Sequence, residues 1–383
     1  MTAVAVLATG AAVALPAQAA PPAPLLATYV VTVAPSSAPS AVAPLTAALG
    51  GRVGFVYAHA LHGFSVTLPT LAEPLLRALP GVVAVQPNQV LHASATQADP
   101  PSYGLDRIDQ RALPLSHSYT TTSQGAGVTA YVVDTGIRYD HRDFGGRATP
   151  GFDAITPGGG AVDCNGHGTH VSGTIGGTAY GVAKAVRLVG VRVLDCSGSG
   201  TTAQVVAGLD WVIGNHQAGV PAVANLSLGG SADTALDTAV KNAIADGITF
   251  GVAAGNDGGF VTDLLGSSDA CNGSPSRVPA ALTVAATDAS DARASYSNRG
   301  SCVDLWAPGS AIVSDWYTSA TATQTLNGTS MATPHVVGAA ALLLAKGYQS
   351  PAAVAVALIA ASTKNVVTGA GSGTPNRLLF TNG

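Results

Sequence analysis

The chain has 383 residues, of which 47% are hydrophobic and only 10% are charged, with 46 glycines and a net charge of −4. This length and composition allow a large core and favour two domains, and they argue against a disordered protein or a coiled coil. No block of Lys or Arg occurs, so we do not expect a nucleic acid as partner.

The first segment, residues 4–19, is apolar, rich in small residues and ends in Ala17-Gln18-Ala19. It predicts a secretory signal peptide over residues 1–20, too short to span a bilayer, and hence a secreted, extracellular protein without membrane contact after secretion. The alternative is a disordered Ala-rich tail. No Lys or Arg precedes Arg52, so the usual positive region is missing, which is compatible with a start codon further upstream.

Residues 25–94 are predicted to form a small independent α+β module. Its candidate elements are a strand, a helix, two strands, a helix and a strand, at residues 29–33, 41–49, 53–57, 63–68, 71–79 and 82–86. This order is that of a ferredoxin-like fold. A polar stretch over residues 94–101 follows and is predicted to be an exposed linker, where proteolytic processing concentrates.

Beyond this linker, apolar strands alternate with helices. The predicted strands are 128–133, 188–193, 223–227, 249–253 and 282–285, and the predicted helices are 201–216, 234–245 and 331–346. Near-continuous hydrophobic strands separated by helices are typical of a parallel sheet covered on both faces. We therefore predict an α/β fold with a mainly parallel sheet between two helical layers. Functional groups gather beyond the carboxyl ends of such strands, where Asp134 and Asn256 stand.

Four cysteines occur, at Cys164, Cys196, Cys271 and Cys302. None of their spacings is the close one of a zinc site, and two disulfides are the expected use of four cysteines in an exported protein. The sequence permits three ways of joining the four cysteines into two disulfides. We favour the one that joins the first cysteine to the second and the third to the fourth.

Three short segments each place one residue of a hydrolytic triad in a distinctive local frame. They are Tyr131-Val132-Val133-Asp134-Thr135-Gly136-Ile137, Asn165-Gly166-His167-Gly168-Thr169-His170 and Asn327-Gly328-Thr329-Ser330-Met331-Ala332-Thr333-Pro334-His335. The order Asp, His, Ser is one of the orders in which this chemistry is known. One match alone would be weak, whereas all three in this order, with Ala253-Ala254-Gly255-Asn256 between the last two, are hard to explain by chance.

Each candidate has a structural alternative. The carboxylate of Asp134 follows a buried strand, where it can orient a histidine or only form an Asx turn. Ser330 precedes a long apolar helix, where it can be a nucleophile near the helix dipole or only an N-cap. The amide of Asn256 can donate to an oxyanion or belong to an ordinary turn. His167 and His170 lack a His-Glu-x-x-His pattern, so we assign the general base to His167 and a packing position to His170.

These motifs make the chain similar to subtilisin-family serine endopeptidases of the proteinase K type, particularly their aqualysin-like members. Further matching segments are residues 104–111, 163–170, 224–230, 323–331 and 372–379. The resemblance covers residues 95–383 and implies a subtilisin-like three-layer fold there. Residues 25–94 resemble, more weakly, the inhibitory propeptide of the family.

The resemblance implies a set of site residues. The triad falls on Asp134, His167 and Ser330, with Asn256 as the oxyanion donor. The substrate backbone pairs with Ser227-Leu228-Gly229 as an added strand. That segment and Ala253-Ala254-Gly255 line a primary pocket for apolar or small side chains, with no acidic residue at its base. The aqualysin-like pairing of the cysteines is Cys164–Cys196 and Cys271–Cys302.

The resemblance also implies structural calcium and no catalytic cofactor. One site would use the backbone carbonyls of Pro279 and Ala281 and the carboxylate of Asp304, an oxygen-only set that suits a hard cation. The alternative there is an unoccupied loop. A second family site, near Asp106 and Asp109, is less expected because its later ligand positions carry serines.

Together these features predict a secreted endopeptidase made as an inactive precursor that cleaves itself near Ser94/Ala95. Its expected partners are protein and peptide substrates and its own propeptide as an intramolecular inhibitor, and it is expected to be a monomer. Two other functions remain open: a catalytically silent binding protein with the same fold, and a hydrolase of lipids or esters. The frame Gly-x-Ser-x-Ala at Ser330 disfavours the last, because α/β-hydrolases carry Gly-x-Ser-x-Gly.

Overall fold

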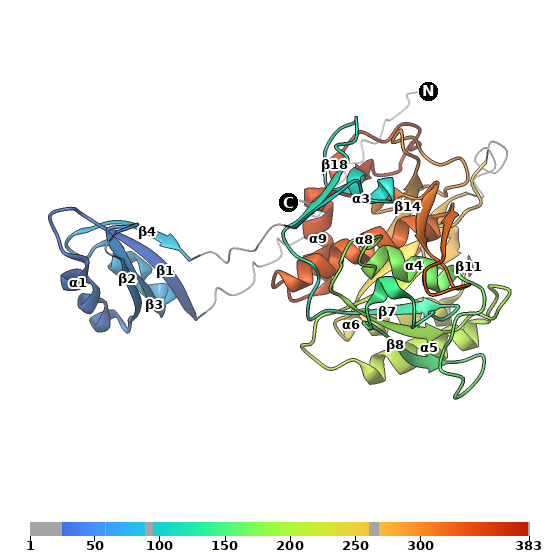
Figure 1. Ribbon diagram of the computed structural model, residues 1–383, viewed down its shortest axis with the longest axis horizontal. Coiled ribbons are helices and arrows are strands. Elements are labelled where there is room, and N and C mark those ends of the chain that lie inside the picture. The colour runs from blue at the N-terminus through green and yellow to red at the C-terminus, as the bar shows by residue number, and fades with distance from the viewer. Residues whose placement is uncertain (1–24, 58, 89–94, 260–267, 382–383) are drawn as a thin grey trace, which may run out of the picture. The chain divides into compact units, whose positions relative to one another are not determined.

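The computed structural model describes residues 25–57, 59–88, 95–259 and 268–381 (Figure 1). The chain divides into two compact units, Met1–Leu91 and His92–Gly383. The predicted signal peptide, residues 1–20, and the six residues 89–94 immediately before the predicted cleavage point at Ser94/Ala95 lie outside the described residues. None of the helices in the described ranges has the length and apolar character needed to cross a membrane.

The first unit is a four-stranded antiparallel sheet in the order β2-β3-β1-β4. Its elements are β1 (Leu26–Val33), α1 (Pro39–Val42), η1 (Ala43–Leu49), β2 (Arg52–Tyr57), β3 (Gly63–Pro69), η2 (Thr70–Ala72), α2 (Glu73–Arg77) and β4 (Val82–Pro87). The four predicted strands are present. Each predicted helix is instead split into a short α-helical and a 3-10 piece, because Pro44 and Pro74 lack the amide that would continue an α-helix.

The second unit is built on a nine-stranded sheet in the order β18-β19-β15-β14-β12-β10-β7-β9-β8. Neighbouring strands are parallel except at the β18–β19 edge. The sheet strands are β7 (Thr129–Asp134), β8 (Ala148–Asp153), β9 (Arg187–Arg192), β10 (Ala222–Leu226), β12 (Thr249–Ala253), β14 (Leu282–Thr287), β15 (Leu305–Pro308), β18 (Thr363–Lys364) and β19 (Arg377–Leu378).

The remaining elements of this unit are helices and short strand pairs. The helices are α3 (Tyr103–Ile108), η3 (Arg142–Phe144), α4 (His167–Gly176), α5 (Thr202–Asn215), α6 (Thr234–Ala245), η4 (Ala270–Asn272), α8 (Thr329–Ala345) and α9 (Pro351–Ala361). The paired strands are β5 (Ala95–Ala98) with β6 (Ser118–Thr121), β11 (Gly230–Ser231) with β13 (Gly273–Ser274), and β16 (Ile312–Asp315) with β17 (Thr323–Leu326).

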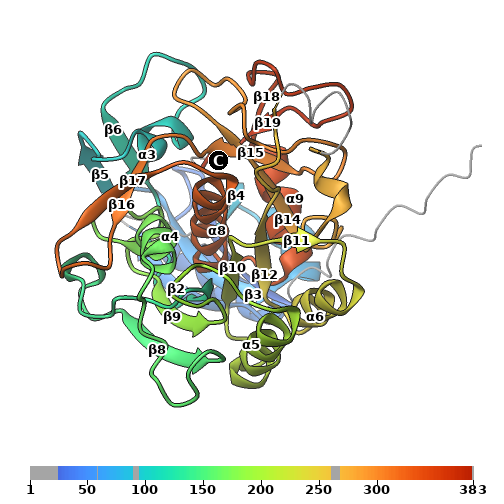
Figure 2. The same ribbon diagram turned by 90° about the vertical axis from the view of Figure 1, so that its right-hand side faces the viewer.

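The sheet separates two hydrophobic cores. Along β7, Ala130 and Val132 face the core that contains residues of α4, α8 and α9, whereas Tyr131 and Val133 face the core that contains residues of α5 and α6. Side chains alternate between the two faces of a strand, so a strand buried on both faces is apolar throughout. Figure 2 shows α5 and α6 on one side of β10 and β12 and α8 on the other. This is the predicted three-layer α/β architecture.

The sequence analysis did not predict the sheet strands β8, β15, β18 and β19 or the helix α9. Strand β8 contains Pro150 and Gly151, which are rare inside strands, and it forms an edge of the sheet. Helix α9 is almost entirely apolar and therefore shows no helical periodicity. Strand β8 therefore lacks the continuous apolar run from which the other sheet strands are predicted, and α9 lacks the alternation of polar and apolar residues that marks a helix.

Candidate active site

The predicted catalytic and substrate-binding side chains lie at the ends of three adjacent strands and at the starts of two helices, α4 and α8. Strands β7, β10 and β12 are neighbours in the sheet, and each ends immediately before or at a candidate residue. Asp134 is the last residue of β7, Ser227 follows β10, and Asn256 follows β12 by three residues. Ser330 is the second residue of α8, whose N-terminus lies at the same edge and contacts Ser227.

Asp134 and His167 form a buried pair. The side chain of Asp134 is fully buried, and that of His167, the first residue of α4, is 25% exposed. The imidazole Nδ1–H donates to both carboxylate oxygens, at 2.8 and 2.9 Å. Because a carboxylate can only accept, Nδ1 carries the proton and Nε2 keeps its lone pair. This is the tautomer that a general base needs.

Two opposing effects act on the pKa of His167. Burial disfavours the imidazolium and by itself lowers the pKa, whereas the charge of Asp134 and its hydrogen bond favour the imidazolium. Asp163 contributes a further negative charge, and the result is a pKa of His167 raised above its ordinary value. The pair therefore stabilises the cation that forms when His167 takes up a proton.

A second carboxylate, Asp163, holds the start of α4. Its Oδ1 accepts hydrogen bonds from Thr135 Oγ1 and from the amides of Asn165 and Gly166, each at 2.9 Å. Its Oδ2 accepts from the amide and hydroxyl of Thr169. Asp163 therefore fixes the loop before His167 and the first turn after it. The sequence places Asp163 in a segment that resembles the family but indicates no function for it; only its five hydrogen-bond donors reveal that it positions His167.

His170 is the packing residue that the sequence predicted. It is fully buried, and its Nε2–H donates to the carbonyls of Ile312 and Gln324 at 3.1 and 3.2 Å. Burial, followed by the neighbouring His167, lowers its pKa to about 3. A histidine held neutral in this way ties α4 to the β16–β17 pair.

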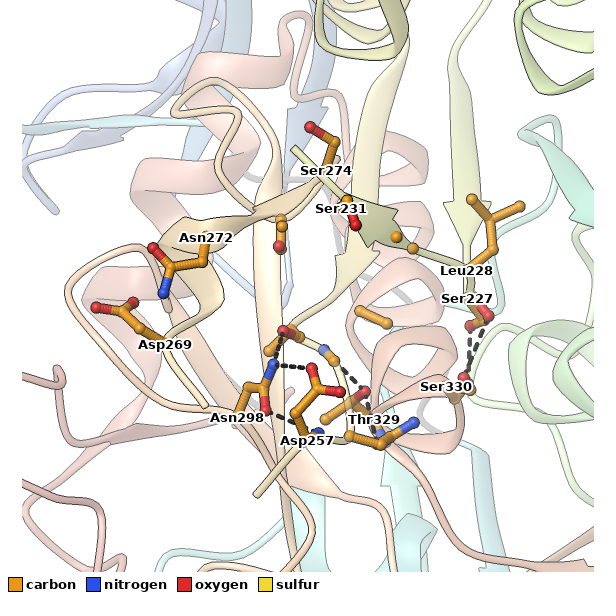
Figure 3. A pocket seen from close by; sticks show the side chains of 18 residues that line it. Ser227, Leu228, Ser231, Asp257, Asp269, Asn272, Ser274, Asn298, Thr329 and Ser330 are labelled. Carbon is orange, nitrogen blue, oxygen red and sulfur yellow. Dashed lines mark hydrogen bonds between the residues drawn. The ribbon is translucent and has the colours of Figure 1, made fainter. Parts of the chain in front are cut away.

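Ser330 and Ser227 are joined by two reciprocal hydrogen bonds (Figure 3). The hydroxyl of Ser330 donates to the carbonyl of Ser227 at 3.1 Å, and the hydroxyl of Ser227 donates to the carbonyl of Ser330 at 2.8 Å. Among the described residues, Ser330 Oγ thus bonds to Ser227 and not to His167 Nε2. Contact between the hydroxyl and the imidazole requires another rotamer of Ser330 and stays a prediction.

The amide of Asn256 has a fixed orientation. Its Oδ1 accepts from both the backbone amide and the hydroxyl of Thr329, at 2.8 and 3.0 Å. The Nδ2 group is therefore left to donate. A Cβ placed on Gly328 would stand 3.5 Å from the amide nitrogen of Ser330 and 3.7 Å from Asn256 Nδ2. The two donors thus border the same small space at the N-terminus of α8.

The turn that carries Asn256 is held by Asn298, which the sequence did not reveal. Gly255 has a φ of +102°, and a Cβ there would lie 2.4 Å from Asn298 Nδ2. Asn298 donates from Nδ2 to the carbonyl of Ala254 and to Asp257 Oδ2, and its Oδ1 accepts from the amide of Asp257. The amide of Asn298 fills the space that a side chain at Gly255 would occupy. Because Asn298 belongs to a loop that is distant in the sequence, no local pattern could identify it.

A pocket of about 570 Å³ lies beside Ser330. All six predicted substrate-binding residues line it, namely Ser227, Leu228, Gly229, Ala253, Ala254 and Gly255. Asp257 and Asp269 also line this pocket, and the expectation of no acidic residue at its base stays a prediction. Each carboxylate already has a donor: Asp257 accepts from Asn298, and Asp269 accepts from the amide of Cys271 at 2.9 Å.

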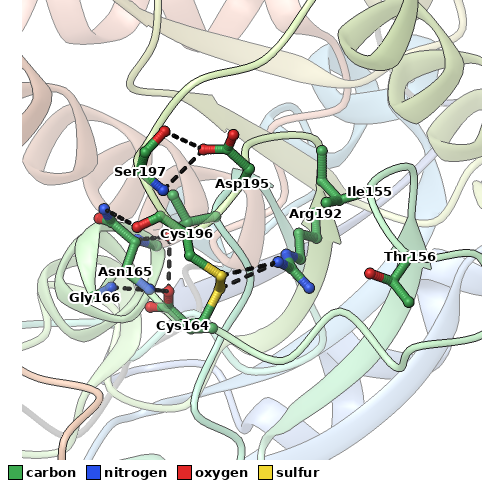
Figure 4. Close-up of a disulfide and its surroundings, with 12 residues drawn as sticks. Ile155, Thr156, Cys164, Asn165, Gly166, Arg192, Asp195, Cys196 and Ser197 are labelled. Carbon is green, nitrogen blue, oxygen red and sulfur yellow. Dashed lines mark hydrogen bonds between the residues drawn. A yellow bond between two sulfur atoms is a disulfide. The ribbon is translucent and has the colours of Figure 1, made fainter.

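A second pocket, of about 680 Å³, contains His167 and shares residues 227–231 with the first. Its far wall is formed by residues 197–202, which the disulfide Cys164–Cys196 links to the segment before His167 (Figure 4). Arg192 lies beside this disulfide and contacts both sulfur atoms. The second disulfide joins Cys271 to Cys302, so the predicted pairing is confirmed.

The carboxylates at the two candidate calcium sites differ in how many hydrogen bonds they already accept from the protein. Asp304 is partly buried, its Oδ2 accepts from the amide of Thr283, and burial raises its pKa to about 6. A cation beside this carboxylate would offset its burial, and oxygen-only ligation suits a hard cation, so a calcium site at Asp304 with the carbonyls of Pro279 and Ala281 stays a prediction. At the second family site, Asp106 already accepts from the amide and hydroxyl of Ser116 and from the amide of His117. In the described part of the chain, no group of three or more His, Cys, Asp or Glu is arranged to hold a metal.

Comparison with known proteins agrees with this geometry. The model of the subtilase family matches residues 125–378. The extracellular serine proteinase of Thermus sp. (strain Rt41A) is 58% identical over 334 residues, which cover 87% of this chain and 78% of that protein. The alkaline serine exoprotease A of Vibrio alginolyticus is 47% identical over 86% of this chain, and the match spans 60% of its own length.

A solved structure extends the likeness to three dimensions. The crystal structure of a cold adapted subtilisin-like serine proteinase superposes with a TM-score of 0.68 and 52% sequence identity, over 73% of this chain and 97% of the other. The family match covers more than half of the chain and includes Asp134, His167, Asn256 and Ser330. The chain therefore belongs to the subtilase family and is a serine proteinase.

Proposed function

We propose that this subtilase is a secreted endopeptidase that hydrolyses peptide bonds of proteins with a triad of Asp134, His167 and Ser330. The observation that supports it best is the bidentate contact of His167 Nδ1 with Asp134, which leaves Nε2 as a base. The relatives from Thermus and Vibrio are an extracellular serine proteinase and an alkaline serine exoprotease, which supports both secretion and proteolysis for this chain.

In the proposed reaction, Ser330 turns from Ser227 toward His167, which takes the hydroxyl proton while Oγ attacks the peptide carbonyl. Asp134 keeps the ring in place and stabilises the imidazolium. The Ser330 amide and Asn256 Nδ2 donate to the oxyanion, supported by the positive end of the α8 dipole. His167 then protonates the leaving amine, and water hydrolyses the acyl-enzyme. No catalytic cofactor is needed.

The substrate is proposed to bind as an added strand along Ser227-Leu228-Gly229, with its reacting residue in the pocket beside Ser330. Alanine and glycine form the wall at residues 253–255, which leaves room for apolar or small side chains. Asp257 and Asp269 each already accept a hydrogen bond from another residue of the protein. Neither carboxylate therefore depends on a basic substrate side chain for a donor, which supports this preference.

We further propose that residues 25–94 are a propeptide that inhibits the enzyme until cleavage near Ser94/Ala95. The compact first unit and its own hydrophobic core support an independent module, with Val31, Phe64 and Leu76 fully buried. Calcium, bound by Asp304 and the carbonyls of Pro279 and Ala281, is proposed to stabilise the loop after residue 278 without a part in the reaction. The mature protein is proposed to be a monomer.

Expression of the Ser330→Ala variant tests the reaction and the processing together. We expect the variant to accumulate as an uncleaved precursor, whereas N-terminal sequencing of secreted wild type should begin near Ala95. Normal processing of the variant would show that cleavage does not require Ser330 and would contradict self-cleavage.

Labelling separates an enzyme from a silent binding protein. A serine-directed phosphonate should label wild type at Ser330 and should not label His167→Ala. Parallel assays on casein and on a long-chain ester should show turnover of casein. Turnover of the ester alone would favour the lipid or ester hydrolase instead.

A further inference from the structure

Two carboxylates outside the active site lie near each other beside α4. Asp315, the last residue of β16, has a fully buried side chain, and neither of its oxygens has a hydrogen-bond partner among the described residues. Its neighbour Asp143 is partly buried and lies close enough for its charge and hydrogen bonding to raise the pKa of Asp315. A buried carboxylate beside a second one is repelled unless a positive charge or a proton lies between them.

The neighbours of Asp315 are hydrogen-bond acceptors. The amide of Asp143 donates to His141 Nδ1 at 3.3 Å, and His141 Nε2–H donates to the carbonyl of Ala322 at 3.0 Å. His141 is therefore neutral and presents the lone pair of Nδ1, which lies 3.4 Å from Asp315 Oδ1. The carboxylate of Asp143 accepts a hydrogen bond from the amide of Ala179 at 2.8 Å. A proton on Asp315 is the donor that this arrangement lacks.

Helix α4 adds a second reason for a neutral Asp315. A Cβ at Gly173 would lie 2.7 Å from Asp315 Oδ2, and one at Gly177 would lie 2.1 Å from Asp143 Oδ2. Both carboxylates thus pack against the last turn of α4, where the helix dipole presents its negative end. The two glycines leave the space that the carboxylates fill.

The other charged groups around the pair do not replace a proton. Arg147 lies close enough to lower the pKa of Asp315, but its Nη atoms donate to the carbonyls of Gly176, Val186 and Asp143 and to Thr178 Oγ1. Lys184 donates to carbonyls of the 178–181 loop. Tyr180 is neutral at ordinary pH, because burial raises its pKa further.

We propose that Asp315, fully buried, and Asp143, partly buried, share one proton as an acid–carboxylate pair, and that this pair makes the packing of β16 against α4 sensitive to alkaline pH. The observations favour a proton over a metal ion because, among the described residues, no group of three or more His, Cys, Asp or Glu side chains is arranged as a cation site. Because α4 begins at His167, the pair anchors the opposite end of the helix that carries the proposed base.

The direction of the effect follows from the pKa. Burial, and after it the charge and hydrogen bond of Asp143, raise the pKa of Asp315 from the ordinary 3.8 to about 9. Between these values the folded chain binds a proton that the unfolded chain has released, so stability falls as pH rises. The contribution of Asp315 to stability is intact below about pH 4 and is lost progressively up to about pH 9.

Thermal unfolding of Asp315→Asn as a function of pH tests the proposal. Mature enzyme is first inactivated with a serine-directed phosphonate so that autolysis does not interfere. The amide keeps the shape and supplies a donor without a titrating proton, so we expect the Tm of the variant to exceed that of wild type by several degrees at pH 8. The gap should shrink toward zero near pH 4.5. Asp140→Asn, which removes an exposed charge from the same segment, should show a small gap at both pH values.

An infrared difference spectrum identifies the proton directly. At pH 7, wild type should show the C=O band of a protonated carboxyl that is absent from Asp315→Asn. A Tm gap that does not change with pH, or a missing band, would overturn the shared proton. A larger loss of Tm on chelation in wild type than in Asp315→Asn would also overturn it, in favour of a bound cation.

Discussion

Asp134 and Asp315 are both fully buried aspartates at the last position of a strand, yet their surroundings are opposite. Asp134 receives the Nδ1–H of His167 and the amide of Thr135, whereas Asp315 receives no donor among the described residues. Burial excludes water from both sites equally. The donors that replace the water therefore decide whether the carboxylate stays charged, as a partner of a base, or takes up a proton.

Replacing Asp134 with Asn should have the largest effect, a fall of about 10⁴ in kcat, because the amide no longer holds the required tautomer of His167. The pKa of His167 should also fall, since the carboxylate is what raises it. The base must be neutral to act, so the acid limb of the residual pH–rate profile should move to lower pH. Measured profiles of kcat/KM check both, and Asp315→Asn should leave the acid limb of wild type in place.

Replacing Asn256 with Ala should lower kcat by about 10²–10³ with little change in KM, the effect of losing one oxyanion donor in a subtilisin. The Thr329→Val variant keeps that donor but loses the hydroxyl that orients it, so its loss of kcat should be smaller. Steady-state kinetics on a peptide substrate compare the two. Equal kcat values for Asn256→Ala and wild type would exclude Asn256 as an oxyanion donor.

Asp163 and Asp315 should respond to the same substitution with opposite signs. Asp163 accepts five hydrogen bonds, so Asp163→Asn turns an amide group toward donors and should destabilise the fold by about 3 kcal/mol. Asp315→Asn should instead stabilise it at neutral pH. Denaturant unfolding of the inactivated enzymes measures the free energy of unfolding of both variants. A change of the same sign in the two variants would contradict our view that hydrogen-bond donors decide the charge state of a buried carboxylate.

The smallest effect is expected at Asp304. Chelation of wild type should lower its Tm, and Asp304→Asn should reduce that loss without changing kcat on a short peptide. If calcium binds there, it also lowers the pKa of Asp304 from about 6, so the loss should be larger at pH 7 than at pH 5. Identical responses of wild type and variant to chelation would remove Asp304 from the calcium ligands.

Much of the site could be predicted because its residues stand in short local frames. Asp134, His167 and Ser330 each occupy a strand end or helix start that periodicity and flanking glycines mark. Strand β12 and helix α6 begin and end where their patterns predict. Asn298 could not be found in this way, because its contacts are with a turn far away in the sequence.

The sequence by itself determined the order of apolar strands and helices and the three frames of the triad, since periodicity and turn residues act over a few neighbouring positions. Only the tertiary structure decided that Asn298 supports the oxyanion turn, that Asp163 holds the start of α4, and that Asp315 lies against Asp143. These contacts depend on which distant segments exclude water from a polar group and which donors they bring to it. That information lies in the packing of the chain.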